Sequence, residues 1–127
     1  MILTVGQGQQ FSSIQHAINY IAAWLGSLGN TTLTDTVKIE VYSGVYGGFI
    51  VQPSTIFPTS TYRLIIQAKP GHDVTLSGFI TNPTLGHGSR MVGIGIGDNT
   101  PYVTLRGLKV ENFHKGIYRF QIPARNY

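Results

Sequence analysis

Residues 74–79 read VTLSGF, and residues 103–108 read VTLRGL. Four of the six positions are identical, and a fifth stays apolar. Apolar runs are centred on Ile39 and Ile65, and a second pair, centred on Ile50 and Leu76, has the same separation along the chain. A strand unit that returns at such intervals indicates stacked repeats, in which each unit buries its apolar side chains on its neighbours.

The rest of the sequence beyond residue 30 is typical of short strands separated by turns. Residues 37–42 read VKIEVY and alternate apolar with polar side chains, as a half-buried strand does. Turn-forming residues lie between the apolar runs, at residues 43–44, 53–54, 69–71, 82–83 and 98–101. Charged residues make up 11% of the chain, against about 25% in an ordinary soluble domain. This composition predicts an all-β protein.

One helix is expected before these strands, at about residues 12–25. Its apolar side chains recur at helical spacing and form one stripe: Ile14, Ala17, Ile18, Ile21, Leu25 and Leu28. Ser12 and Gln15 have the spacing of a capping box at its start. Gly26 and Gly29 are suitable stops. We expect this amphipathic helix to cover one end of the stacked strands.

The order of helix and strands resembles the pectin-lyase-like superfamily of right-handed parallel β-helices. The resemblance covers roughly residues 3–118 and is carried by residues 3–5, 11–18, 37–46 and 103–112. It implies an all-β, right-handed parallel β-helix, or solenoid, with one N-terminal capping α-helix. Residues 1–127 are then a single domain, with the cap in residues 1–30 and about four coils in residues 31–127.

Members of this superfamily include pectin esterases, pectate lyases and phage tailspikes, so the fold does not choose the function. The paired catalytic aspartates of the esterases are absent, and the five acidic residues are scattered. We therefore expect a non-catalytic structural or binding protein, in first place a phage virion component of the tail or capsid surface that contacts glycan or other virion proteins. The alternative is an N-terminal fragment of a polysaccharide lyase, hydrolase or esterase whose active site lies beyond this chain.

The formal net charge is +4, and the whole excess lies in residues 101–127. One interpretation is a solvated surface. The other is a contact face for an acidic polymer or an acidic protein. The candidate binding residues are the basic side chains of this segment with two tyrosines, on whose rings sugars or proteins stack: Arg106, Lys109, Lys115, Arg119, Tyr102 and Tyr118.

No catalytic residue is assigned. Asp73 and Asp98 are the best isolated acids for a two-carboxylate hydrolase, but both lie in turns. His87 and Ser89 are near neighbours in a loop, which rarely makes a nucleophile and base. The glycines of residues 93–97 alternate with isoleucine and predict a strand packed closely against another backbone, not a phosphate loop.

No metal or cofactor is expected, because the chain lacks cysteine and its histidines lack metal-binding spacing. The first residues have neither a basic region nor a long apolar run, so we expect no signal peptide and no membrane span. The predicted location is the virion or the extracellular space.

Self-association is the expected partner interaction. Residues 116–127 contain no second amphipathic helix to cover the last coil, so a homo-oligomer, first a trimer, or contact with other virion proteins is predicted. An anionic polysaccharide is a further expected partner, and nucleic acid is not.

Overall fold

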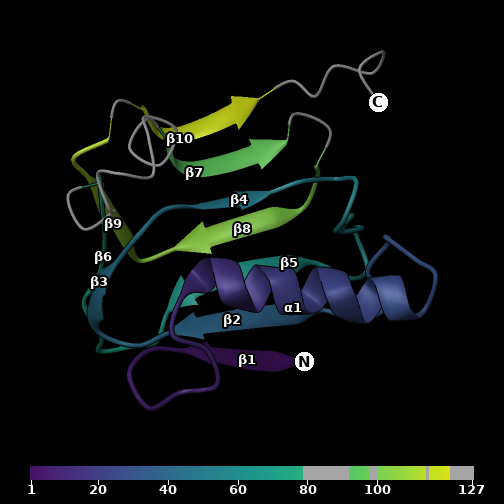
Figure 1. Cartoon of the computed structure of the whole chain (residues 1–127), viewed down its shortest axis with the longest axis horizontal. Helices are drawn as coiled ribbons and strands as arrows, with labels where there is room; N and C mark the ends of the chain where they lie inside the picture. Colours follow the sequence, from purple (N-terminus) through teal and green to yellow (C-terminus); the bar gives the residue numbers. More distant parts are fainter. Residues whose placement is uncertain (79–91, 98–99, 114, 121–127) are drawn as a thin grey trace.

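The computed structural model describes residues 1–78, 92–97, 100–113 and 115–120. These residues form one helix and ten strands (Figure 1), in the order β1 (Ile2–Val5), α1 (Ile14–Ser27), β2 (Val37–Val41), β3 (Gly44–Tyr46), β4 (Phe49–Val51), β5 (Leu64–Ala68), β6 (Val74–Ser77), β7 (Val92–Gly97), β8 (Val103–Arg106), β9 (Leu108–Glu111) and β10 (Lys115–Phe120).

The strands make three separate parallel sheets. One sheet has four strands in the order β1-β2-β5-β8, and the other two have three strands each, in the orders β3-β6-β9 and β10-β7-β4. From β2 onward, strands that follow one another in the chain lie in different sheets, and each strand pairs with one from a distant segment, whereas β1 and β2 pair in the same sheet. In the four-stranded sheet the inward positions are fully buried in β2, where Val37, Ile39 and Val41 alternate with half-buried Lys38 and Glu40.

The predicted helix is present as α1. Its N-cap is Ser13 and not Ser12, because the Ser13 side chain accepts the hydrogen bond from the His16 N–H at 3.1 Å. The helix ends in a Schellman motif, in which the Asn30 N–H donates to the Leu25 carbonyl at 3.0 Å and Gly29 has φ +68°. Of the two predicted stops, Gly29 is therefore the one used, and Gly26 lies inside the helix.

One face of α1 joins the same hydrophobic core as the strands. Its five buried side chains are those of the predicted stripe, without Leu28: Ile14, Ala17, Ile18, Ile21 and Leu25. The helix contacts β1, β2 and β4 and lies alongside β1 and β2 in Figure 1. It is therefore a structural layer of the core, and it covers the inner side chains of two different sheets.

The expected fold class, an all-β right-handed parallel β-helix with a capping helix, is wrong. The described residues form a small mixed α/β arrangement of three separate parallel sheets and one helix, and no solenoid of about four coils is evident in them. The separations between paired residues are unequal: Val37 pairs with Leu64, and Leu64 pairs with Val103, across a clearly longer stretch of chain. The strands of this sheet therefore do not return at a constant repeat.

The similarity between residues 74–79 and 103–108 led to the wrong fold because it reflects local strand sequence and not strand pairing. Residues 74–77 form β6 and residues 103–106 form β8, and these two strands lie in different sheets. The true partner of Val74 is Leu108, and that of Val103 is Leu64. The expectation for residues 93–97 is confirmed in one respect, because a Cβ on Gly93 would come within 2.7 Å of the Gly116 carbonyl oxygen.

Candidate functional site

The candidate site lies where the strands of the four-stranded sheet begin. Thr36, Arg63 and Tyr102 each come immediately before a strand, β2, β5 and β8 respectively. The pairing of Val37 with Leu64 and of Leu64 with Val103 places these three residues side by side. Main-chain hydrogen bonds hold the row, since the Val37 N–H donates to the Arg63 carbonyl at 2.9 Å and the Leu64 N–H donates to the Tyr102 carbonyl at 3.3 Å.

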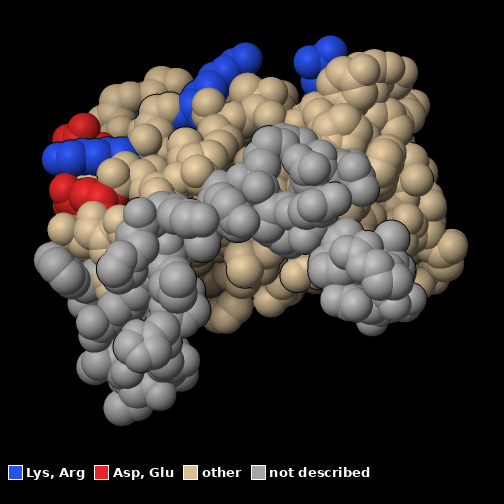
Figure 2. Space-filling view, turned by 90° about the horizontal axis from the view of Figure 1, so that it is seen from above, with Lys and Arg blue, Asp and Glu red and all other residues tan. Residues whose placement is uncertain are grey.

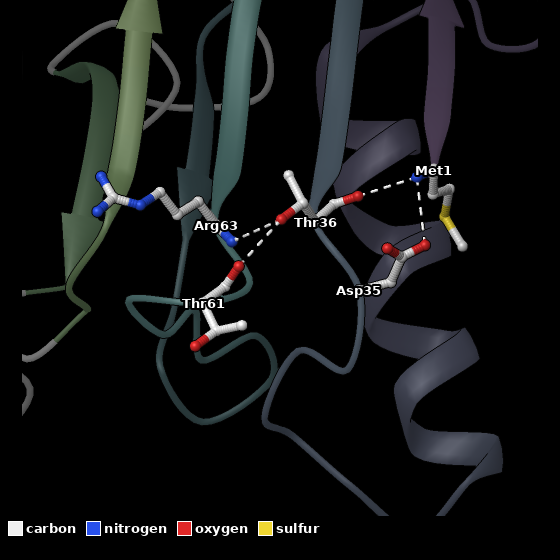
Figure 3. Close-up of polar contacts among 5 residues, drawn as sticks. All are labelled: Met1, Asp35, Thr36, Thr61 and Arg63. Carbon is white, nitrogen blue, oxygen red and sulfur yellow. Dashed lines mark hydrogen bonds and ion pairs between the residues drawn. The ribbon is translucent and has the colours of Figure 1, made fainter.

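At one end of this row the polar groups satisfy one another (Figure 3). The amino group of Met1 donates to the Thr36 carbonyl at 2.9 Å and forms an ion pair with Asp35 at 3.2 Å. The Thr36 hydroxyl donates to the Thr61 carbonyl at 3.4 Å and accepts from the Arg63 main-chain N–H at 3.3 Å. These contacts fix the backbone from which the Arg63 side chain extends.

The Arg63 guanidinium is held on one side and open on the other. Its Nε–H donates to the Ser60 carbonyl at 3.3 Å, and its Cζ lies 5.2 Å from the centre of the Tyr102 ring. Figure 3 shows the guanidinium pointing away from Thr36 and Thr61. The two terminal NH₂ groups make no hydrogen bond or ion pair with a described residue. They are a planar pair of donors that matches a carboxylate, sulfate or phosphate.

Tyr102 presents its ring to solvent and is 46% exposed. Its backbone has φ +56°, a left-handed conformation that costs a residue with a Cβ about 1 kcal/mol or more. In this conformation the Tyr102 carbonyl accepts the Leu64 main-chain N–H, and the Tyr102 ring lies beside the Arg63 guanidinium. The result is a surface with one cation and one exposed aromatic ring, which we name the Arg63–Tyr102 platform.

The other predicted binding residues lie on three different sheets. Arg106 ends β8, Lys109 lies in β9, and the backbones of Lys115, Tyr118 and Arg119 lie in β10. Their sheets are separate, and the side chains of the three β10 residues lie outside the described part. Figure 2 shows the basic side chains of one face as separate projections, one of them beside acidic side chains. Binding by these residues stays a prediction.

Lys109 has a partner within its own strand. Its Nζ lies 3.9 Å from Glu111 Oε2, and both side chains are exposed. An exposed pair of this kind contributes about 0–1 kcal/mol to stability, but it also lowers the local positive charge. Lys109 is thus a weaker anchor for an acidic partner than Arg63, whose terminal donors have no acidic neighbour among the described residues.

Asp73 lies in the connection between β5 and β6, directly before β6. Its main-chain N–H donates to Ser43 Oγ at 3.0 Å, and its carboxylate is exposed. The second predicted acid, Asp98, lies outside the described residues, as do His87 and Ser89.

Ser43 and His72 make a contact that the sequence interpretation did not foresee. The Ser43 Oγ lies 3.1 Å from His72 Nδ1, which also accepts the Ser43 main-chain N–H at 2.9 Å. The imidazole stacks edge-on against Tyr42, with ring centres 4.8 Å apart. Because the backbone N–H already occupies the lone pair of Nδ1, this nitrogen is poorly placed to take a proton from the hydroxyl. The contact ties two turns together.

Within the described ranges no group of three or more His, Cys, Asp or Glu side chains comes together to hold a metal ion. In the same part of the chain, no helix is long and apolar enough to cross a membrane. Comparisons with protein-family models, curated proteins and solved structures found no match to this chain.

Arg63 is the functional candidate that sequence reasoning missed. It lies outside residues 101–127, the segment that holds the chain's excess of positive charge. The available signal was its position directly before the apolar run of residues 64–66, which matches the position of Tyr102 before residues 103–105. This signal is informative only when the pairing of β5 with β8 is known, and that pairing joins two segments far apart in the sequence.

Proposed function

We propose that this chain is a non-catalytic binding protein that takes an anionic group, in first place the carboxylate of an acidic glycan, on the Arg63–Tyr102 platform. The observation that carries the proposal is a guanidinium that lies over an exposed tyrosine ring and has both terminal NH₂ groups free of described partners. A uronic acid offers a carboxylate to the guanidinium and a C–H face to an aromatic ring. Acidic glycans combine both features in one residue.

The location and the class of protein that the sequence predicts remain part of the proposal. We propose a virion or extracellular location, with a tail or capsid-surface component as the first candidate. The alternative is a fragment of a polysaccharide-active enzyme whose active site lies elsewhere, and genomic neighbourhood separates the two. Binding to nucleic acid is not part of the proposal.

Self-association, with a trimer as the first candidate, is supported by one apolar row. Phe49 and Ile94 are buried, but Ile117, which pairs next to Ile94 in β10, is 61% exposed. A second copy or another protein on this row would remove the Ile117 side chain from water. Light scattering tests it, and a monomer at micromolar concentration counts against self-association.

The platform is tested by calorimetric titration with oligogalacturonate, with its fully methyl-esterified form as the uncharged comparison. We expect Arg63→Gln to abolish binding of the acidic form and Arg63→Lys to weaken it strongly, because an ammonium lacks the planar pair of donors. Tyr102→Leu removes the ring and also weakens binding. Affinity falls with added salt.

Lys69→Gln is the matched control, because it removes the same charge from a side chain that also lies over a tyrosine ring, 5.3 Å from the centre of Tyr42, and is not part of the platform. If Lys69→Gln weakens binding as much as Arg63→Gln, general charge accounts for the affinity and the platform does not. Absence of oligogalacturonate binding at low salt also contradicts the proposal.

A further inference from the structure

A groove of about 390 Å³ lies between α1 and β4, and none of its lining side chains is charged. Four of them carry an amide or a hydroxyl: Gln15, Asn19, Gln52 and Thr55. The other three are apolar: Ile18, Ala22 and Ile50. The groove is formed by other elements than the Arg63–Tyr102 platform, which lies at the starts of β5 and β8.

Gln15 fixes the floor of this groove. The Ile50 N–H donates to Gln15 Oε1 at 2.8 Å, and Gln15 Nε2 donates to the Ile50 carbonyl at 3.4 Å. The side-chain amide thus takes both main-chain groups of Ile50, as a neighbouring strand would. An added peptide strand has no free partner at this residue of β4, so strand addition is not favoured there.

A second hydrogen bond sets the orientation of the next amide. Gln15 Nε2 also donates to Asn19 Oδ1 at 3.0 Å, which assigns the acceptor end of Asn19 and leaves its Nδ2 as a donor. The Asn19 Nδ2 and the Gln52 side-chain amide make no hydrogen bond with a described residue. Thr55 donates its hydroxyl proton to the Gln52 carbonyl at 3.1 Å and keeps its oxygen as an acceptor.

Apolar surface lies beside these polar groups, since Ile50 is 44% exposed. Oriented donors and acceptors next to C–H surface suit a ligand that has hydroxyl groups on one side and C–H groups on the other. The uncharged lining offers no counter-ion, so transfer of a charged group from water into the groove is unfavourable. The volume lies at the small end of the usual range for ligand pockets, roughly 300–1,000 Å³.

We propose that this groove binds a neutral sugar unit, with Asn19 and Gln52 as the hydrogen-bonding side chains and Ile50 as the apolar contact. The proposal does not depend on acidic-glycan binding at the platform, because the two sites share no residue and differ in charge. Neutral-sugar binding here is expected to be insensitive to salt, whereas binding at the platform is not.

The experiment is an NMR titration of the full chain with D-glucose, D-galactose, N-acetylglucosamine and maltotriose. We expect saturable shifts of the Asn19 and Gln52 side-chain amides for at least one probe, unchanged in raised salt and in Arg63→Gln. Gln52→Leu and Asn19→Leu each weaken that binding roughly fivefold, as loss of one or two neutral hydrogen bonds predicts.

Gln7→Leu is the matched control, since Gln7 is an exposed glutamine that does not line the groove. Both Gln52 and Asn19 are exposed, so the variants are expected to fold, and the amide spectrum of each checks this. The proposal is overturned if no probe gives saturable shifts, or if Gln7→Leu weakens binding as much as Gln52→Leu. Failure of oligogalacturonate binding leaves this outcome unaffected.

Discussion

Replacing Tyr46 with phenylalanine tests how the connection between β2 and β3 is held. Tyr46 is only 8% exposed, and its hydroxyl donates to the Tyr42 carbonyl at 2.6 Å. The Tyr46 side chain is tightly enclosed, since a Cβ placed on Gly6 would come within 3.3 Å of its hydroxyl oxygen and a Cβ placed on Gly44 within 3.2 Å of its ring. Tyr46→Phe keeps the ring and removes one neutral hydrogen bond, so we expect the free energy of unfolding near neutral pH to fall by about 1 kcal/mol.

The pH dependence of this loss is the sharper measurement. Burial raises the pKa of the Tyr46 hydroxyl above its usual value of about 10. The folded chain therefore holds this proton more tightly than the unfolded chain does. The corresponding stabilisation is complete below pH 10 and is lost as the pH rises above that value. Tyr46→Phe has no proton to lose, so the difference in stability between parent and variant should shrink above pH 10.

Urea unfolding of parent and variant at a series of pH values from neutral to above 10 measures this difference. Effects of pH that are common to the two proteins cancel when their stabilities are compared at each pH. The reasoning is refuted if Tyr46→Phe is as stable as the parent at neutral pH. It is also refuted if the difference stays constant across the alkaline range.

Three further expectations follow from the packing and the turn acids. Ile18→Asp should lower the free energy of unfolding by about 3 kcal/mol or more, because it puts a charge into the core. Ala23→Asp, on the exposed face of α1, is its control, and equal melting temperatures of the two variants would contradict the helix packing. Gly93→Ala should cost roughly 1–3 kcal/mol, since its Cβ would meet the Gly116 carbonyl, while Gly26→Ala, with open space around it, should stabilise by about 0.5 kcal/mol; denaturant midpoints that reverse this order would refute the assignment. The chain should release neither reducing ends nor unsaturated products from pectin or polygalacturonate, and turnover that depends on Asp73 would overturn the non-catalytic proposal.

Much of the local structure could be predicted from the sequence. The helix stripe, the alternation in residues 37–41 and the apolar runs that became β4, β5, β6 and β8 each depend on neighbours in the chain, and local periodicity reports such neighbours directly. The N-cap was misplaced by one residue because Ser12 and Ser13 are both capable acceptors, and the choice depends on local backbone geometry.

Strand pairing and the candidate site could not be predicted in the same way. Pairing in parallel sheets joins distant segments, and similar strands such as residues 74–77 and 103–106 are equally good partners by composition. The Arg63–Tyr102 platform depends on that pairing, so Tyr102 was found as an exposed ring without its cation. Closeness in sequence was the reason for grouping Arg106, Lys109 and Lys115, although the strands that carry them lie in three different sheets.

The residues before β2, β5 and β8 stay in one row even when the length of the chain between these strands changes, so the position of the platform does not depend on that length. The stretch of chain from Leu64 to Val103 is longer than the stretch from Val37 to Leu64, yet both pairs stand in the same register. The sheet fixes the position at which each strand starts, and only the connecting segments differ in length. Insertions or deletions between strands can therefore accumulate, or be introduced by design, while Arg63 and Tyr102 stay side by side. Screens for relatives should score the residues before paired strands and allow the spacing between them to vary.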